Sequence, residues 1–182
     1  MYDPIAAFDA RRAAPAWWSL LGACLGCLLL LPSQGHASNP DMPELAELEW
    51  ILDSQAASLT GIVFDIREYD PDALVWVLPR LAAYMELIER ARPGLPVALI
   101  SHGDEMALLT ARAARTHAEL HRELRRLHAR GLTIHVCATF ARELGLDETD
   151  FPPYVDVVPF GPAQLEDYVQ MGYGHVSLEI TW

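Results

Sequence analysis

Short apolar runs alternate with longer amphipathic stretches along most of the chain. The apolar runs are rich in β-branched residues and have the length of buried strands, whereas the stretches between them repeat apolar residues at helical spacing. Five runs predict strands, at residues 60–66, 96–101, 132–137, 154–160 and 175–181. The intervening stretches predict helices, at residues 70–92, 106–129 (as one helix or two), 139–145 and 162–171. A short amphipathic helix around residues 45–52 precedes the first strand.

This alternation of strands and helices determines the predicted fold class. Strands joined through helices form βαβ units, in which consecutive strands run parallel. We therefore expect an α/β fold, a single three-layer domain with a mostly parallel sheet of about five strands and helices on both faces. Asp70 and Pro71 predict the start of the first long helix, and Pro79 predicts a kink within it. Thr139 is expected to cap the short helix after the third strand.

The charge of the chain excludes several classes of function. The formal net charge is -12, from 25 acidic and 13 basic residues, and every basic residue is arginine. Because lysine is absent, Schiff-base chemistry and a P-loop are excluded. An acidic surface repels phosphate backbones, so we expect no nucleic-acid partner. The sequence also lacks the G-x-S-x-G and G-x-G-x-x-G motifs, which disfavours the common hydrolases and dinucleotide-dependent enzymes.

Residues 1–37 have the pattern of a signal peptide. Arg11 and Arg12 precede the apolar stretch 13–31, Pro32 ends it, and small residues up to Ala37 suit a signal peptidase. The alternative is an uncleaved membrane anchor, because the apolar stretch is close to the ~20 residues that a span needs. We expect an exported, periplasmic protein that is not inserted in the membrane once the leader is cleaved. A leading segment, 38–58, would then precede the main domain, 59–182.

Cys137 is the leading candidate for chemistry. Two of the three cysteines, Cys24 and Cys27, lie in the predicted leader, so Cys137 is the single cysteine of the expected mature chain. It ends the third strand just before a helix, whose partial positive charge and free N–H groups stabilise a thiolate. The other interpretation is a buried structural cysteine, because free cysteine is among the most buried residue types.

Other polar residues follow the second and third strands. The carboxyl ends of parallel strands meet at one edge of the sheet, so residues there would share the crevice of Cys137 if these strands are neighbours. The candidate supporting or binding residues are His102, Gly103, Asp104, Glu105, His135 and Thr139. A mixed zinc or copper site of His102, Asp104, His135 and Cys137 is chemically possible, but the sequence gives no geometry that brings these ligands to one point, and we expect no metal or other cofactor. The pair His117 and His121 also departs from the zinc-binding H-E-x-x-H pattern.

Two segments of the chain resemble the DsrE/DsrF-like family. Residues 101–110 (SHGDEMALLT) are similar to the family's strand-end His-Gly and the Leu-Leu-Thr that follows it. Residues 131–139 (GLTIHVCAT) are similar to its strand with a single cysteine. Residues 154–159 (YVDVVP) and the later Gly172-Tyr173 complete the likeness, which covers about residues 60–182.

The resemblance implies an assembly and an activity. It implies a homotrimer or hexamer, and it matches Cys137 to the cysteine that carries a persulfide in sulfur-relay members. A sulfur donor or acceptor protein would then be a partner, and the thiolate would have to be nucleophilic and accessible. The first hypothesis is therefore an exported sulfur-handling protein, which would be a carrier or transferase at most. The second is a non-catalytic ligand-binding or assembly module in which Cys137 is structural.

Overall fold

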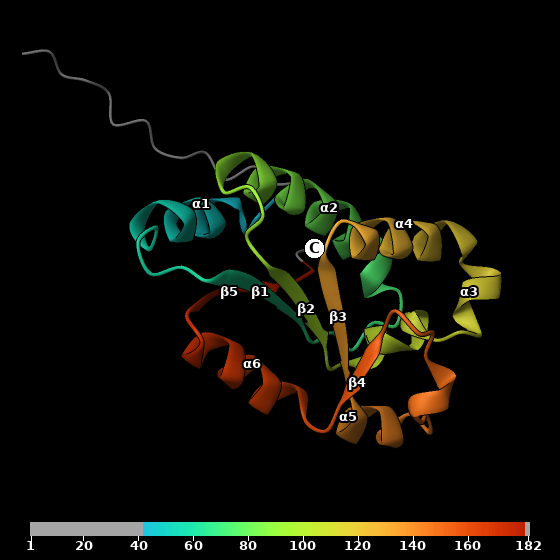
Figure 1. Cartoon of the computed structure of the whole chain (residues 1–182). Helices are drawn as coiled ribbons and strands as arrows, with labels where there is room; N and C mark the ends of the chain where they lie inside the picture. Colours follow the sequence, from blue (N-terminus) through green and yellow to red (C-terminus); the bar gives the residue numbers. More distant parts are fainter. Residues whose placement is uncertain (1–41, 181–182) are drawn as a thin grey trace, which may run out of the picture. The chain divides into compact units, whose positions relative to one another are not determined.

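The strands form one parallel sheet, as the sequence predicts (Figure 1). The computed structural model describes residues 42–180, so the predicted leader, 1–37, lies outside the described residues. The five strands of this part are β1 (Gly61–Ile66), β2 (Val97–Ser101), β3 (Leu132–Cys137), β4 (Asp156–Val158) and β5 (Tyr173–Leu178). Their order is β4-β3-β2-β1-β5, and every neighbouring pair is parallel. The predicted α/β fold is confirmed.

Helices cover both faces of the sheet, which completes the predicted three-layer arrangement (Figure 1). On one face lie α1 (Leu45–Ser54), α2 (Ala73–Ala91) and α4 (Ala118–Ala129), and on the other lies α6 (Gly161–Gln170). The main core forms under the first layer, where the ring of Tyr84 stacks on that of Phe64 at 5.9 Å. The cluster under α6 is much smaller and is built on Val63, Ala98 and Ile100. The face under α6 is therefore the one that carries most of the polar strand residues.

The leading segment is joined to the rest of the fold through Glu44. This buried residue precedes α1, and its carboxylate accepts a hydrogen bond from the Tyr84 hydroxyl at 2.7 Å. It also pairs with Arg80 at 3.1 Å and accepts from the N–H of Glu179 at 3.2 Å. Two distant parts of the chain, α2 and the segment after β5, thus bind this carboxylate, so α1 is an integral part of the domain.

The stretch 106–129, expected to form one helix or two, contains three helical elements, because the chain breaks it twice. A 3-10 helix, η1 (Asp104–Leu109), is followed by the short α3 (Ala113–Thr116) and then by α4. Thr110 separates the first two with an extended backbone, and its hydroxyl accepts a hydrogen bond from the N–H of Ala113 at 3.1 Å. The backbone of His117 leaves the helical region between α3 and α4. The Thr110 hydroxyl thus favours a local cap over helix continuation.

Other element boundaries also differ from the prediction. The helix expected from Asp70 begins at Ala73, and Asp70 caps the turn before it by accepting a hydrogen bond from the N–H of Asp72 at 2.9 Å. Pro79 lies inside α2, which continues as one helix. The edge strand β4 is only three residues long. The remaining helical elements are α5 (Ala138–Glu143) and η2 (Glu148–Asp150).

Thr139 does not cap α5, contrary to the expectation from the sequence. The N-cap position belongs to Cys137, the last residue of β3. The hydroxyl of Thr139 instead donates a hydrogen bond to the carbonyl of Pro159 at 3.0 Å. This bond ties α5 to the loop between β4 and α6, so the two elements next to Cys137 are held together.

Candidate functional site

A buried carboxylate lies between two imidazoles on the α6 face of the sheet. Asp65, on β1, accepts a hydrogen bond from Nε2 of His102 at 3.1 Å and from Nε2 of His175 at 2.5 Å. His102 directly follows β2, and His175 lies on β5, so the three residues come from three adjacent strands. Asp65 is only 7% exposed. The carboxylate accepts only, which requires that both Nε2 atoms carry hydrogen.

The two imidazoles decide the ionisation of this cluster. Burial alone would raise the pKa of Asp65, but the hydrogen bonds and charges of His102 and His175 together hold it well below its usual range. The hydrogen bond to Asp65 in turn raises the pKa of His175, against the effect of its partial burial. Asp65 is therefore a fixed negative charge at neutral pH, and each imidazole points one N–H at it.

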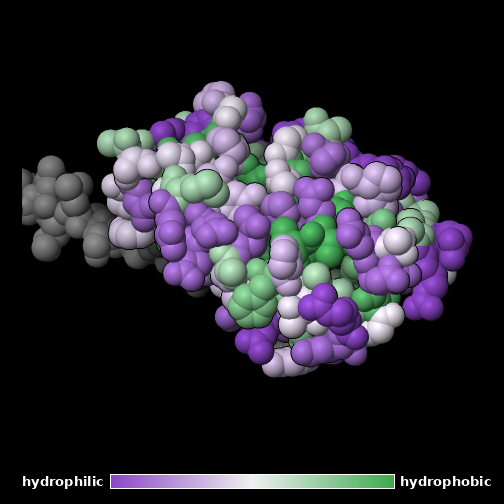
Figure 2. All heavy atoms as spheres, turned by 60° about the horizontal axis from the view of Figure 1, so that its bottom comes forward, coloured by the Kyte–Doolittle hydropathy of each residue, from purple (hydrophilic) through white to green (hydrophobic). Residues whose placement is uncertain are grey.

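Cys137 borders a small pocket at the carboxyl edge of the sheet. The pocket has a volume of about 240 Å³, and its walls include Arg67, His102, Cys137 and Thr139 together with Phe140 and Phe160. Cys137 itself is only 2% exposed. Figure 2 turns the side with α5 and α6 toward the viewer and shows apolar side chains gathered between polar ones. The thiol is therefore placed at the wall of a pocket, and it is not open to bulk solvent.

Gly161, the first residue of α6, lies directly over this part of the site. A Cβ added there would be 3.1 Å from Cβ of His102 and 3.2 Å from Cβ of Cys137. The Cβ atoms of His102 and Cys137 therefore both lie close to Gly161. Because any larger residue would press on both, glycine allows α6 to begin next to the thiol, which also precedes α5.

The other predicted residues after β2 lie away from the thiol. Glu105 is fully buried, and its carboxylate accepts hydrogen bonds from the Ser101 hydroxyl at 2.7 Å, the Gly103 N–H at 3.0 Å and the Glu68 N–H at 2.9 Å. Burial raises its pKa despite these bonds. Asp104 donates its N–H to the Glu68 carbonyl at 2.7 Å.

Residues 103–105 therefore hold the loop after β2 against the loop after β1. A Cβ at Gly103 would lie 2.5 Å from both the N and O atoms of Glu68, so only glycine allows the loops after β1 and β2 to approach this closely. The approach directs Glu105 inward, and neither Asp104 nor Glu105 is among the residues that line the Cys137 pocket. The shared crevice that we expected contains His102 but not the two acidic residues that follow it.

His135 lies on the same face of the sheet as Asp65, but its side chain contacts α6 and not Cys137 or His102. Its Nε2 is hydrogen-bonded to the hydroxyl of Tyr168, on α6, at 2.8 Å. Burial lowers its pKa, and the charge of Asp156 opposes that effect. Within residues 42–180, its buried Nδ1 has no hydrogen-bond partner. His135 is therefore packed between β3 and α6 and does not line the pocket of Cys137.

The described residues were compared with the requirements of a metal site and of a membrane-spanning helix. Between residues 42 and 180, no three His, Cys, Asp or Glu side chains are grouped so that they could hold a metal ion. His121 is buried, with Nδ1 against the Tyr154 hydroxyl and Nε2 against the Leu108 carbonyl, so it does not form a site with His117. None of the helices in this part combines the length and the apolar character of a membrane span.

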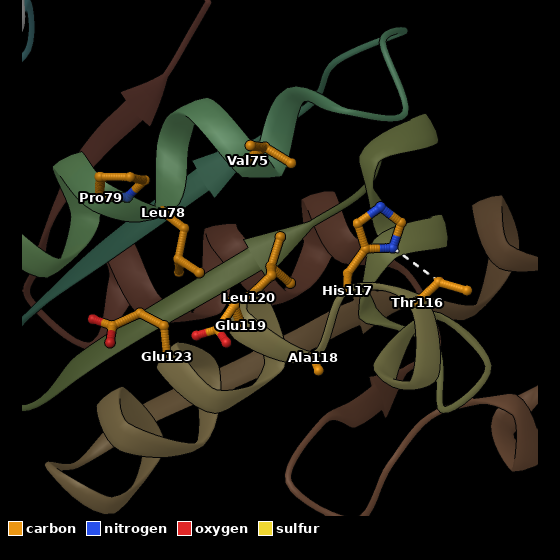
Figure 3. A pocket seen from close by; sticks show the side chains of 9 residues that line it. All are labelled: Val75, Leu78, Pro79, Thr116, His117, Ala118, Glu119, Leu120 and Glu123. Atoms are coloured by element: carbon orange, nitrogen blue, oxygen red, sulfur yellow. Dashed lines mark hydrogen bonds between the residues drawn. The ribbon is translucent and has the colours of Figure 1, made fainter.

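A second hollow lies on the other side of the sheet. It has a volume of about 660 Å³, with residues of α2 such as Leu78 and Pro79 on one side and residues of α4 such as Leu120 on the other (Figure 3). His117 and Glu123 also border it. No cysteine lines this groove, so we locate the candidate chemistry at the Cys137 pocket.

Sequence reasoning missed Asp65, His175 and Arg67. Asp65 did leave a signal, because it is the only charged residue in β1, a strand in which every position is buried. A charge inside such a strand needs partners, since burying it alone is costly. The identity of those partners depends on which strands lie beside β1. The sequence did not predict that order.

The pH dependence of stability should report on His175. Its raised pKa means that its protonated form stabilises the fold, a contribution fully present below the unfolded-state pKa of ~6.5 and lost as the pH rises through the folded-state value. The variant His175→Gln should therefore be less stable than the wild type at pH 5.5, and the difference should shrink by pH 8.5. Urea unfolding at several pH values measures this difference. In an Asp65→Asn background the same substitution should show little pH dependence, and a difference that is constant with pH in the wild type would contradict this assignment.

Two solved structures are similar to this chain. A protein of unknown function from Methanobacterium thermoautotrophicum matches with a TM-score of 0.53 and 18% identity, over 64% of this chain and 96% of that chain. A conserved protein of unknown function from Bacteroides thetaiotaomicron is 16% identical with a TM-score of 0.49, over 67% of this chain and 98% of that chain. At such low identity, the first match shows the fold alone.

Comparison with protein families gives a more specific result. No curated protein matches the chain. The sequence model of the DsrE/DsrF-like family, in contrast, matches residues 76–178, more than half of the chain and a range that includes both His102 and Cys137. The chain therefore belongs to the DsrE/DsrF-like family.

Proposed function

We propose that this protein carries sulfane sulfur as a persulfide on Cys137. The observation that carries the proposal is the position of the thiol, which ends β3, precedes α5 and lines a pocket next to His102. The pocket, with a volume of about 240 Å³, is large enough for a small sulfur donor. Membership of the DsrE/DsrF-like family supports a sulfur-relay role at the level of the family.

The chain itself favours a carrier over a disulfide exchanger. Cys137 is the only cysteine between residues 42 and 180, so no second thiol of this part can resolve a persulfide into an internal disulfide. A persulfide on Cys137 would therefore persist until an external thiol accepts the sulfur. The partner would be a protein or small molecule that donates or accepts sulfane sulfur.

One observation favours a different function. Cys137 is 2% exposed, as expected for a structural cysteine in a non-catalytic ligand-binding or assembly module. The exposed Trp50 and Trp76, at 61% and 60%, are large apolar side chains of the kind that bury against other copies or partners. We propose a homotrimer or hexamer under either function, which light scattering after gel filtration would test.

Persulfide formation can be measured by mass spectrometry. We would incubate the full chain with polysulfide in a Cys24→Ser, Cys27→Ser background, so that Cys137 is the only thiol. The expected result is the added mass of one sulfur atom on the peptide that contains Cys137, removable by dithiothreitol. The matched control adds Cys137→Ser and should show no adduct. A Cys137 that gains no sulfur, and that iodoacetamide labels only after denaturation, would instead support the structural role.

We also propose that the protein is exported to the periplasm, which rests on the pattern of residues 1–37. Expression of the full chain in a bacterium with two membranes, followed by cell fractionation and N-terminal sequencing, tests this. The expected product is periplasmic and begins at residue 38. A product in the membrane fraction that retains residues 1–37 would show an anchor instead.

A further inference from the structure

One ring nitrogen of His102, Nε2, is hydrogen-bonded to Asp65, and the other, Nδ1, is not hydrogen-bonded to a described residue. Nε2 donates to Asp65, which in turn receives a second hydrogen bond from His175. Nδ1 of His102 forms no hydrogen bond with any residue between 42 and 180. With the proton of the neutral ring held on Nε2, Nδ1 presents a lone pair that can accept a proton.

His102 and Cys137 lie close together at the carboxyl edge of the sheet. Both residues line the same pocket, and the first residue of α6 touches the start of both side chains. The side chain of His102 is only 11% exposed, so its orientation is fixed by packing and by Asp65. Cys137 is a free cysteine and forms no disulfide in the described part of the chain.

We propose that His102 is the proton acceptor for the Cys137 thiol and that Asp65 is the residue that positions it. This inference rests on the proposed function and deepens it, because it names the groups that would activate the carrier. A nucleophile, a base beside it and a third group that orients the base form a recurring arrangement for thiol and hydroxyl activation. Here the three groups are Cys137 at the end of β3, His102 after β2 and Asp65 on β1.

The proposed step is balanced without an oxidant. The proton of Cys137 passes to Nδ1 of His102, and the thiolate attacks the terminal sulfur of a donor persulfide, R–S–SH. A bond forms between the Cys137 sulfur and that terminal sulfur, while the S–S bond of the donor breaks and its electron pair leaves with R–S⁻. His102 returns the proton to this leaving group. The products are R–SH and the Cys137 persulfide, so no net oxidation occurs.

Other charged groups surround the proposed base. Arg67 and Glu143 line the same pocket, and His175 binds the second oxygen of Asp65. Arg67 favours a thiolate or an anionic donor, whereas Glu143 opposes both. Glu105 is fully buried in its own network of hydrogen bonds, away from the pocket lining. The measured pH profile will contain contributions from these neighbours, which are unchanged in the variants below.

The test measures the rate of iodoacetamide labelling of Cys137 between pH 5.5 and 9.5. The full chain would carry Cys24→Ser and Cys27→Ser, and labelling would be followed by intact mass. We expect His102→Gln to slow labelling about tenfold at pH 6.5 and to match the parent protein at pH 9.5, where hydroxide removes the proton. Asp65→Asn should shift the profile in the same direction by a smaller factor. His128→Gln, on the exposed end of α4, is the matched control and should keep the parent profile.

Two outcomes would overturn the inference. One is an identical pH profile for the parent protein and His102→Gln. The other is an equal slowing at every pH, which would indicate altered access to the thiol and not proton transfer. If Asp65→Asn does not fold, judged by circular dichroism, His102→Gln and His102→Asn carry the test. Persulfide loading is scored separately, so a His102-dependent profile without loading would reject the proposed function alone, and loading without such a profile would reject this inference alone.

Discussion

The buried carboxylate of Asp65 is the constraint on which the functional side of this protein depends. A charge at this depth in a strand is costly unless hydrogen-bond donors surround it, and here the donors are two imidazoles from neighbouring strands. Their approach requires β5 on one side of β1 and the end of β2 on the other, which is the observed order. The same interactions set the orientation of His102 at the edge where Cys137 lies.

The two faces of the sheet differ in how much apolar core they carry. Under α1, α2 and α4 lies a large apolar core, which holds the strands in register. Under α6 the apolar cluster is small, and Asp65, His135 and His175 occupy much of the face. A helix that begins with glycine can cover this face closely without displacing His102 or Cys137. The pocket at the thiol is therefore a consequence of how α6 starts.

Burial of the thiol and its place in a pocket favour opposite functions, and the structure contains both features. A thiol 2% exposed suits packing, yet it borders a pocket with His102 and Arg67. A small donor can reach a thiol at a pocket wall, whereas a large protein surface cannot approach it directly. If Cys137 carries sulfur as proposed, this geometry favours small sulfur donors, or the exposed end of a partner chain, as the species that exchange sulfur with it.

The sequence predicted the fold well because hydrophobic periodicity is a local property that also governs packing. The strand 132–137 was predicted with its observed limits, and the alternation of elements was sufficient for a parallel sheet. The stretch 106–129, expected as one helix or two, is divided into three elements because the chain leaves the helical conformation at Thr110 and His117, which periodicity does not show.

The site was predicted less completely, for a related reason. Cys137 and His102 were expected in one crevice because they lie at the ends of consecutive strands, and the two residues line the same pocket because these strands are neighbours. Glu105 was expected in the same crevice, but it turns inward under the backbone of Glu68. The pairing of Asp65 with His175 joins residues 110 positions apart, on strands whose adjacency depends on the order of the whole sheet.

The most direct test of the account is nitrogen NMR of the imidazole rings, which reports where each proton lies. The proposed activation requires that the neutral ring of His102 carries its hydrogen on Nε2, toward Asp65, and leaves Nδ1 free to accept a proton. In Asp65→Asn this preference should weaken, while the fold is retained. A neutral His102 protonated on Nδ1 in the wild type would contradict the account, because neither the interaction with Asp65 nor the proposed activation of Cys137 could then exist.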